Sequence, residues 1–223
     1  MEWVIEDPKH LEYEIRFSTA ASRPALLPGK YTPIIGDGDL LRYNAGVPRP
    51  FALPYLSRLV DLTGDEKPDL VGCWNYAYRP GWPWDGIVCF ARVGDLDDWT
   101  FGDLVHLRYV EKPDSAELKF ASATYMHADF ADLNKDGLVD IVYSPSNPKR
   151  LFFYLNSGKR DSGGMPVFVA QGDIDRFTDS WGPCRVEDLN KDGALDIVVG
   201  NTFLKNENPD GWPVKVSAGI ALE

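Results

Sequence analysis

Three segments of the chain repeat one order of apolar and polar residues. They read RLVDLTGDEKPDLV from Arg58, DFADLNKDGLVDIV from Asp129 and RVEDLNKDGALDIV from Arg185, and they align without gaps. In each, a short alternating stretch leads into an Asp-rich loop, and a compact apolar run follows. Short apolar runs bounded by polar turn residues are typical of β-strands. Each segment therefore predicts two strands joined by an acidic loop.

The repeat continues beyond these segments with further strands. After the middle loop come a short strand over 140–143 that is apolar after its first residue, a polar turn at 144–148, a strand over 151–156 and another near Phe168. The 20 Gly and 17 Pro are spread along the whole chain, so no long segment keeps a helical period. We expect an all-β fold whose repeat has about four strands, the size of a β-propeller blade.

We expect a single β-propeller domain or propeller fragment over residues 1–223. The first loop aspartates, Asp61, Asp132 and Asp188, are 71 and 56 residues apart, which places blades starting near 54, 124 and 181. Residues 1–51 predict a partial blade, because 36–46 read like its outer half. These blades, about four in number, either close a ring or belong to a larger propeller of about six to eight blades. In a fragment, other blades or a second chain would have to cover the open edges.

Two of the loops carry oxygen-bearing side chains at positions 1, 3, 5 and 9, counted from the first aspartate, and offer the main-chain carbonyl of position 7. These residues are Asp132, Asn134, Asp136, Leu138 and Asp140 in the middle loop, and Asp188, Asn190, Asp192, Ala194 and Asp196 in the last loop. Ca²⁺ binds about six to eight hard oxygen ligands, and a tight loop of this kind can supply many of them. We therefore expect a calcium ion at each of these two loops.

The first loop is a more divergent copy and leaves a third calcium site open. Its candidate ligands are Asp61, Thr63, Asp65, Lys67 through its carbonyl, and Asp69. Thr63 replaces the asparagine of the other loops, and Glu66 replaces their glycine. The loss of glycine threatens the left-handed backbone that such a turn requires.

The acidic loops have two alternative interpretations. An EF-hand or a dockerin would need flanking helices and a carboxylate at position 12, where this chain has Tyr143 and Val199. Asx-rich turns without a metal remain an alternative. They are disfavoured because three converging carboxylates would repel one another in the absence of a cation.

From about residue 54 to 205 the loops and the strands after them resemble the FG-GAP or VCBS repeat family, the calcium-loop β-propellers of integrin alpha subunits and of many secreted bacterial and fungal proteins. The resemblance implies that the loop aspartates and asparagines are structural calcium ligands. The family's Phe-Gly and Gly-Ala-Pro signatures are not evident in this sequence. We therefore expect a VCBS-like repeat and not a close integrin relative.

An aromatic turn is expected on the face opposite the calcium loops. Between residues 74 and 85 it carries five aromatic side chains, Trp74, Tyr76, Tyr78, Trp82 and Trp84. Aromatic rings suit carbohydrate platforms because they offer apolar faces to sugar C–H bonds. The alternative is that these rings pack between blades.

Charged residues in register suggest a second site near the propeller axis. Two residues before each first loop aspartate the chain has an apolar residue, Leu59, Phe130 or Val186, which we expect to face the blade packing. By strand alternation, Arg58, Asp129 and Arg185 would point towards the central funnel. The residues near its entrance are Tyr55, Tyr125, His127 and Trp181.

This arrangement raises a catalytic hypothesis. Arginines that neutralise a uronate carboxylate beside a His or Tyr base would suit a polysaccharide lyase. The candidate catalytic residues are His127, Arg58, Arg185 and Tyr125, and the candidate ligand-binding residues include Asp129 and Trp181. The alternative is a structural His127 and ion pairs between the three charged residues.

The charge, the cysteine count and the hydropathy of the chain disfavour several classes of partner and function. The net charge of −11 disfavours nucleic acid and anionic membranes as partners, and no apolar run approaches a membrane span. Three cysteines are too few for a disulfide framework, so buried free thiols are expected. The opening Met-Glu-Trp-Val lacks a signal-peptide pattern, so a secretion signal would have been removed.

We expect a calcium-binding module of a secreted, periplasmic or cell-surface protein. Carbohydrate binding or a scaffold role is the favoured function. The alternatives are a polysaccharide lyase acting on uronic-acid polymers and an integrin-like adhesion module. Motifs for phosphoryl transfer, zinc chemistry or redox chemistry are absent from the sequence.

Overall fold

The computed structural model describes residues 42–43, 49–50, 55–74, 86–93, 100–120, 126–145, 150–174, 182–216 and 219–222. Within these ranges the chain forms strands and loops and no helix, so the all-β prediction is confirmed. None of these residues belongs to a helix long and apolar enough to cross a membrane.

Three sheets follow one another along the chain, and each has a core of four antiparallel strands that starts with an inner strand. Sheet A contains β3 (Tyr55–Val60), β4 (Asp69–Trp74), β5 (Gly86–Arg92) and β6 (Thr100–His106). Sheet B contains β9 (Met126–Ala131), β10 (Asp140–Pro145), β11 (Leu151–Arg160) and β12 (Pro166–Ile174). Sheet C contains β13 (Cys184–Glu187), β14 (Asp196–Val199), β15 (Thr202–Leu204) and β16 (Ile220–Ala221).

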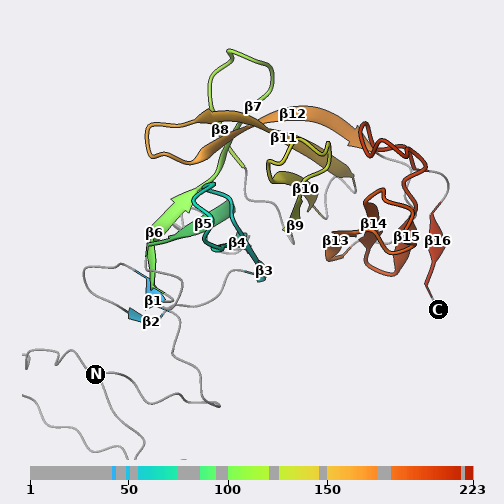
Figure 1. Ribbon diagram of the computed structural model, residues 1–223, viewed down its shortest axis with the longest axis horizontal. Coiled ribbons are helices and arrows are strands. Elements are labelled where there is room, and N and C mark those ends of the chain that lie inside the picture. Colours follow the sequence, from blue (N-terminus) through green and yellow to red (C-terminus); the bar gives the residue numbers. More distant parts are fainter. Residues whose placement is uncertain are drawn as a thin grey trace, which may run out of the picture.

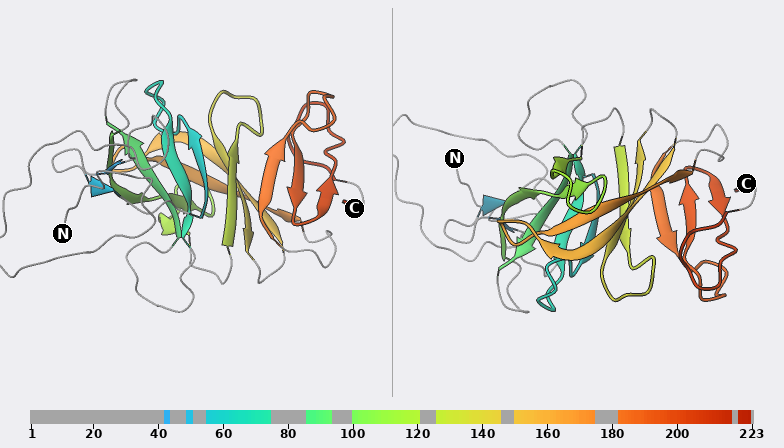
Figure 2. Two further views of the ribbon diagram at one scale, coloured as in Figure 1. Left: turned by 90° about the horizontal axis from the view of Figure 1, so that it is seen from below. Right: turned by 90° about the horizontal axis from the view of Figure 1, so that it is seen from above.

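The sheets are arranged as the blades of a partial β-propeller. Figure 1 shows the inner strands β3, β9 and β13 gathered side by side, with the later strands of each sheet fanning outwards. The three acidic loops join each inner strand to its neighbour, and they lie along the same side of the molecule (Figure 2). The fold therefore brings three loops that are far apart in sequence to one face.

Sheets A and B are each widened by two short strands from the segment that precedes their inner strand. β1 (Arg42–Tyr43) pairs parallel with β6 and antiparallel with β2 (Arg49–Pro50). In the same way β7 (Arg108–Val110) pairs with β12 and with β8 (Leu118–Lys119). The four described residues of the range 1–51 thus lie at the outer edge of sheet A, and the partial blade expected over 1–51, most of which lies outside the described residues, stays a prediction.

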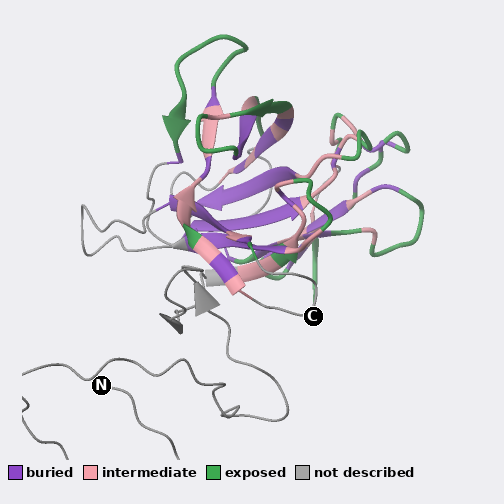
Figure 3. Cartoon of the chain, turned by 60° about the vertical axis from the view of Figure 1, so that its left-hand side comes forward, coloured by how far each residue is buried: buried purple, intermediate pink, exposed green. Residues whose placement is uncertain are grey.

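Strand alternation divides the core into layers between the sheets. In β10, Ile141 and Tyr143 pack towards sheet A, whereas Val142, between them, packs towards sheet C. Ile141 and Val142 are fully buried. Figure 3 shows this arrangement as buried strands in the centre with exposed residues concentrated in the loops. A strand in the middle sheet therefore needs apolar residues on both faces, which explains its continuous apolar sequence.

The apolar position two residues before each loop follows the sheet order. Phe130 is 3 % exposed and packs in the layer between sheets A and B, and Val186 is 4 % exposed between sheets B and C. Leu59 at the equivalent place in β3 is 48 % exposed. The predicted packing between blades is confirmed for Phe130 and Val186, and for Leu59 it stays a prediction because no sheet that precedes sheet A is among the described residues.

The three cysteines are free and buried. Cys73 pairs across the sheet with Ile87, and Cys89 pairs with Val71, so these two thiols are not opposite each other. Burial raises the pKa of Cys73 to about 12, which keeps its thiol protonated. These residues act as small apolar core residues, as expected from their number.

Candidate functional site

The three acidic loops share one backbone conformation. Positions 4 and 6 have positive φ in each loop, with values of 74° and 66° at Gly64 and Glu66, 62° and 84° at Lys135 and Gly137, and 63° and 88° at Lys191 and Gly193. The first loop therefore adopts the same turn although its glycine stands at position 4 and a glutamate at position 6. The left-handed conformation of a residue other than glycine costs about 1–2 kcal/mol, so Glu66 is held there by the rest of the loop.

The first aspartate of the middle loop gathers the amide groups of the turn. Asp132 accepts hydrogen bonds from the N–H of Asp136 at 3.1 Å and of Gly137 at 2.8 Å. The Asp136 carboxylate accepts from the N–H of Leu138 at 2.8 Å and from the Asn134 amide at 2.9 Å. The loop thus wraps its main chain around the oxygens of positions 1, 3 and 5.

The aspartate at position 9 is the buried member of the set. Asp140 is fully buried, and it accepts hydrogen bonds from the N–H of Leu133 at 2.9 Å and of Asn156 at 2.8 Å. Burial raises the pKa of Asp140 to about 6, and the Asp136 and Asp132 carboxylates add to this rise. A cation bound near these carboxylates would favour the charged form of Asp140.

The last loop repeats this arrangement with one difference at position 9. Asp188 accepts from the N–H of Asp192 at 3.1 Å and of Gly193 at 3.0 Å. Asp196 is fully buried, and its Oδ1 accepts from the N–H of Asn206 at 2.9 Å. Its Oδ2 is buried without a hydrogen-bond partner among the described residues. A buried carboxylate oxygen without a donor is costly, and a bound cation would compensate it.

A lysine lies beside the last loop on its exposed side. Lys205 Nζ is 3.2 Å from Asp192 Oδ2, and both side chains are more than a third exposed. The pKa of Asp192 is lowered, first by the hydrogen bond from the N–H of Ala194 and then by the Lys205 contact. An exposed ion pair of this kind contributes little to the free energy of folding, and a divalent cation could displace Lys205 from Asp192.

In the first loop, the aspartate at position 9 accepts more hydrogen bonds than its counterparts in the other two loops. Asp69 is fully buried, and its Oδ2 accepts from the N–H of Leu62 at 2.9 Å and of Thr63 at 2.8 Å. Its Oδ1 accepts from the N–H of Arg92 at 2.8 Å. The Thr63 hydroxyl is 3.2 Å from Asp65 Oδ1, where the middle loop has the amide of Asn134. Burial raises the pKa of Asp69.

The donor set of the middle and last loops fits a hard cation. It consists of carboxylate, amide and main-chain oxygens, which Ca²⁺ prefers and which soft metals do not. Within the described ranges, however, no three His, Cys, Asp or Glu side chains converge closely enough to hold a metal ion. The carboxylates bind the loop amides instead, and among the position 9 aspartates of the three loops Asp196 has a buried oxygen, Oδ2, without a hydrogen-bond partner in the described part of the chain.

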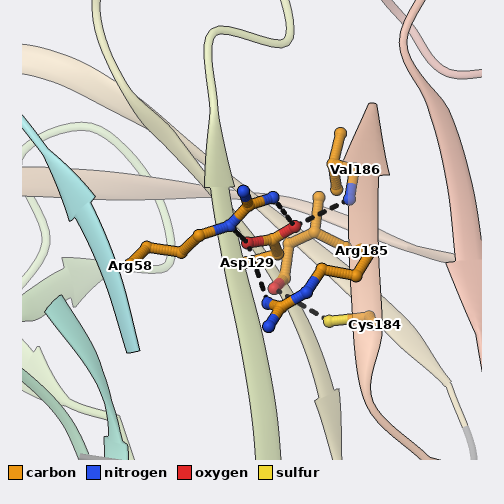
Figure 4. A network of polar contacts seen from close by, with 6 residues as sticks. Arg58, Asp129, Cys184, Arg185 and Val186 are labelled. Atoms are coloured by element: carbon orange, nitrogen blue, oxygen red, sulfur yellow. Dashed lines mark hydrogen bonds and ion pairs between the residues drawn. The ribbon is translucent and has the colours of Figure 1, made fainter. Parts of the chain in front are cut away.

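The three charged residues of the inner strands form one network (Figure 4). Asp129 is fully buried and accepts hydrogen bonds from Arg58 Nε at 2.6 Å and from Arg58 Nη2 at 2.8 Å. It also accepts from the N–H of Val186 at 2.7 Å and from Arg185 Nη1 at 3.4 Å. A single carboxylate of β9 therefore joins the inner strands of sheets A and C.

This network bears on the roles predicted for the candidate catalytic and ligand-binding residues. Asp129 is fully buried and both of its oxygens accept hydrogen bonds from the chain, so its role in ligand binding stays a prediction that this geometry does not favour. His127 is 3 % exposed, and burial followed by the charge of Arg185 lowers its pKa to about 4. A buried His127 is poorly placed to meet a polymer, so the ion-pair alternative is the one that this geometry favours.

Several predicted site residues lie outside the described part of the structure. These are Tyr76, Tyr78, Trp82, Trp84, Tyr125 and Trp181. For Tyr55 and Trp74 only the strand positions are described, at the start of β3 and the end of β4.

Sequence reasoning missed the residues that hold position 9 from the third strand. Asn156 and Asn206 donate their N–H groups to Asp140 and Asp196, and their side chains bond the main chain nearby. An asparagine at the end of an apolar strand in both repeats was the available signal. Arg92, which takes this place in sheet A, carries no such signal.

The ion-pair network predicts that Asp129→Ala is strongly destabilising. It would leave two arginines and the buried N–H of Val186 without their acceptor, at a cost of about 3–5 kcal/mol. Arg185→Ala removes only the longest of these contacts and should cost less. Denaturant unfolding of both variants tests this, and a loss below about 1 kcal/mol in Asp129→Ala would contradict it.

The strained turn predicts that Glu66→Gly stabilises the protein. Removing the left-handed glutamate should gain about 0.5–1 kcal/mol after the extra entropy of glycine in the unfolded chain is included. Glu66→Ala is the matched control, since it removes the carboxylate but leaves the strain. The prediction fails if both variants unfold at the same denaturant concentration.

Comparison with known proteins agrees with the repeat pattern. Residues 132–199 match the model of the FG-GAP-like repeat, from the first aspartate of the middle loop to the end of β14. Comparisons with curated proteins and with solved structures returned no significant match. The family match confirms the resemblance seen in the loops, and the chain contains an FG-GAP-like repeat that spans the middle and last acidic loops.

Proposed function

We propose that this chain is a calcium-stabilised β-propeller module. The observation that carries the proposal is the buried and unpartnered Oδ2 of Asp196 at the end of a loop rich in oxygen donors. Asp188, Asn190, Asp192, the Ala194 carbonyl and Asp196 would hold one ion. Asp132, Asn134, Asp136, the Leu138 carbonyl and Asp140 would hold a second.

The role proposed for the metal is structural. A divalent cation would neutralise the neighbouring carboxylates and compensate the burial of Asp140, which is the main cause of its raised pKa. The loop links an inner strand to the second strand, and its position 9 is bonded to the third strand through Asn156 or Asn206. Fixing the loop would therefore fix three strands of a blade.

The outer face of sheet C is proposed as the contact surface for a further blade or a second chain. Val198 pairs with Phe203, and Phe203 pairs with Ile220, which is 60 % exposed. The corresponding row in sheet B contains Val142 and Phe153, which sheet C buries. A partner at sheet C would extend the same packing by one layer.

Carbohydrate is the proposed ligand, on the face opposite the loops, in a secreted, periplasmic or cell-surface protein. The support is the aromatic turn between residues 74 and 85, whose composition suits sugar rings. A scaffold role agrees with the same fold. A lyase activity has weaker support because His127 is buried and Asp129 engages both Arg58 and Arg185. An integrin-like adhesion role rests on the repeat alone.

The proposal predicts that calcium raises the melting temperature. At a free concentration of about 100 times Kd, one site contributes about 2.7 kcal/mol, which corresponds to a rise of about 5–10 °C for a chain of this size. Differential scanning calorimetry with calcium and with excess chelator measures it. An unchanged melting temperature across the two conditions would contradict calcium binding.

Two variants assign the effect to the loops. Asp196→Asn should remove a large part of the calcium-dependent shift without lowering stability in chelator, because the unpartnered charge is gone. Asp103→Asn, at an exposed position of β6, is the matched control and should keep the full shift.

The carbohydrate proposal predicts binding on a glycan array that disappears in Trp82→Ala and Trp84→Ala, because each removes an aromatic platform. Binding should persist in Asp136→Asn at a temperature where that variant stays folded. Unchanged binding in both tryptophan variants would rule out the aromatic turn as the ligand site.

A further inference from the structure

The first acidic loop is contacted by a cation from the neighbouring sheet. The β11–β12 hairpin of sheet B extends over sheet A (Figure 1), and Arg160 is the last residue of β11. Its Nη1 donates to the carbonyl of Leu62 at 3.2 Å, and its Nη2 donates to the carbonyl of Thr63 at 2.7 Å. The guanidinium group therefore bridges two consecutive carbonyls of the loop.

The hairpin turn holds Arg160 in place. The Asp161 N–H donates to the carbonyl of Met165 at 2.8 Å, and the Asp161 carboxylate accepts from the N–H of Gly163 at 2.8 Å and of Met165 at 2.9 Å. Met165 is 6 % exposed and packs in the layer between sheets A and B. The position of the guanidinium group is thus set by a bonded turn and a buried anchor.

Gly64 makes room for the guanidinium group. A Cβ atom at Gly64 would lie 3.2 Å from Arg160 Nη2. The equivalent position in the other loops is Lys135 or Lys191, with the same left-handed backbone. Glycine at this position therefore accompanies the arginine contact, and lysine occurs where no such contact is made.

The buried aspartates differ in how many main-chain donors they already have. Asp69 accepts three N–H groups, from Leu62, Thr63 and Arg92. Asp140 accepts two, and Asp196 accepts one and keeps a buried Oδ2 without a partner. The need for an external cation is therefore smallest in the first loop and largest in the last.

The middle loop is also contacted by the next sheet, but without a cation entering it. A Cβ atom at Gly211 would lie 3.0 Å from the carbonyl of Leu133, so the main chain of sheet C approaches closely. Lys135 Nζ reaches outwards to the carbonyl of Pro209 at 3.2 Å. Contact with the following sheet is thus shared by both loops, whereas within the described ranges only the first loop has carbonyls bound by an arginine of that sheet.

We propose that the loop Asp61–Asp69 binds no metal ion, because its buried Asp69 already accepts three main-chain N–H groups, and that Arg160 fixes sheet B to this loop of sheet A independently of calcium. The comparison with the other two loops rests on the proposed calcium function. The first loop then needs no metal, and calcium binds at the middle and last loops alone.

Calorimetric titration of the whole chain with Ca²⁺ tests the number of sites. Two sites are expected, with Asp65→Asn leaving both and Asp136→Asn removing one. A third site that disappears in Asp65→Asn would overturn the inference while supporting the proposed calcium function.

Thermal unfolding of Arg160 variants tests the contact itself. Arg160→Ala should lower the melting temperature by about 3–6 °C, equally in calcium and in chelator. Gly64→Lys gives this loop the residue of the other two and should cause a similar loss, with little further loss in the double variant. An unchanged melting temperature in Arg160→Ala, or a loss seen only in calcium, would overturn the inference.

The two proposals fail separately. If no calcium binds to any loop, the proposed function fails, and the loss in Arg160→Ala still decides whether the guanidinium group holds the first loop. If calcium binds at two loops and Arg160→Ala melts like the parent chain, only the inference fails.

Discussion

One buried carboxylate in each blade links three strands through a loop. These residues are Asp69, Asp140 and Asp196, each at the start of a second strand and each fully buried. Their Oδ1 atoms accept N–H groups from residues in or just after the third strand, at 2.8, 2.8 and 2.9 Å. The side chain follows the acidic loop directly, so the geometry of the loop and the pairing of the strands depend on each other.

The cost of burying this carboxylate is met differently in the three blades. In sheet A the main chain supplies three donors, and a guanidinium group from sheet B lies on the same loop. In sheet C the main chain supplies one donor, and one oxygen has none. Three copies of one loop can thus have the same backbone conformation and different demands for a cation, because the demand depends on the donors that surround a single oxygen.

The polar contacts between blades likewise depend on one buried carboxylate. Asp129 binds Arg58 on one side and Arg185 and Val186 on the other, so one buried charge joins three inner strands. Its two arginine partners are partly exposed, with side-chain values of 33 % and 41 %. Together with the apolar layers on both faces of sheet B, this ion-pair network sets the order of the sheets around the axis.

Local pattern by itself determined much of this protein. The repeated order of apolar runs and acidic loops was enough to predict strands, blades and the loop ligands, because strand alternation and turn chemistry act within a few residues. Local pattern did not predict the exposure of Leu59, the left-handed conformation of Glu66 or the roles of Asn156 and Asn206. Each depends on what lies opposite it in space.

Which charged residues contact one another depends on how the inner strands pack in space. Arg58, Asp129 and Arg185 were recognisable in sequence as residues in register, but whether they line an open site or bind one another depends on the distance between inner strands. Arg160 carries no local signal, since its acceptors lie 97 and 98 residues earlier in the chain. Short-range periodicity is enough to specify the repeat and its acidic loops, whereas the packing of one blade on the next places Arg160 against the first of those loops.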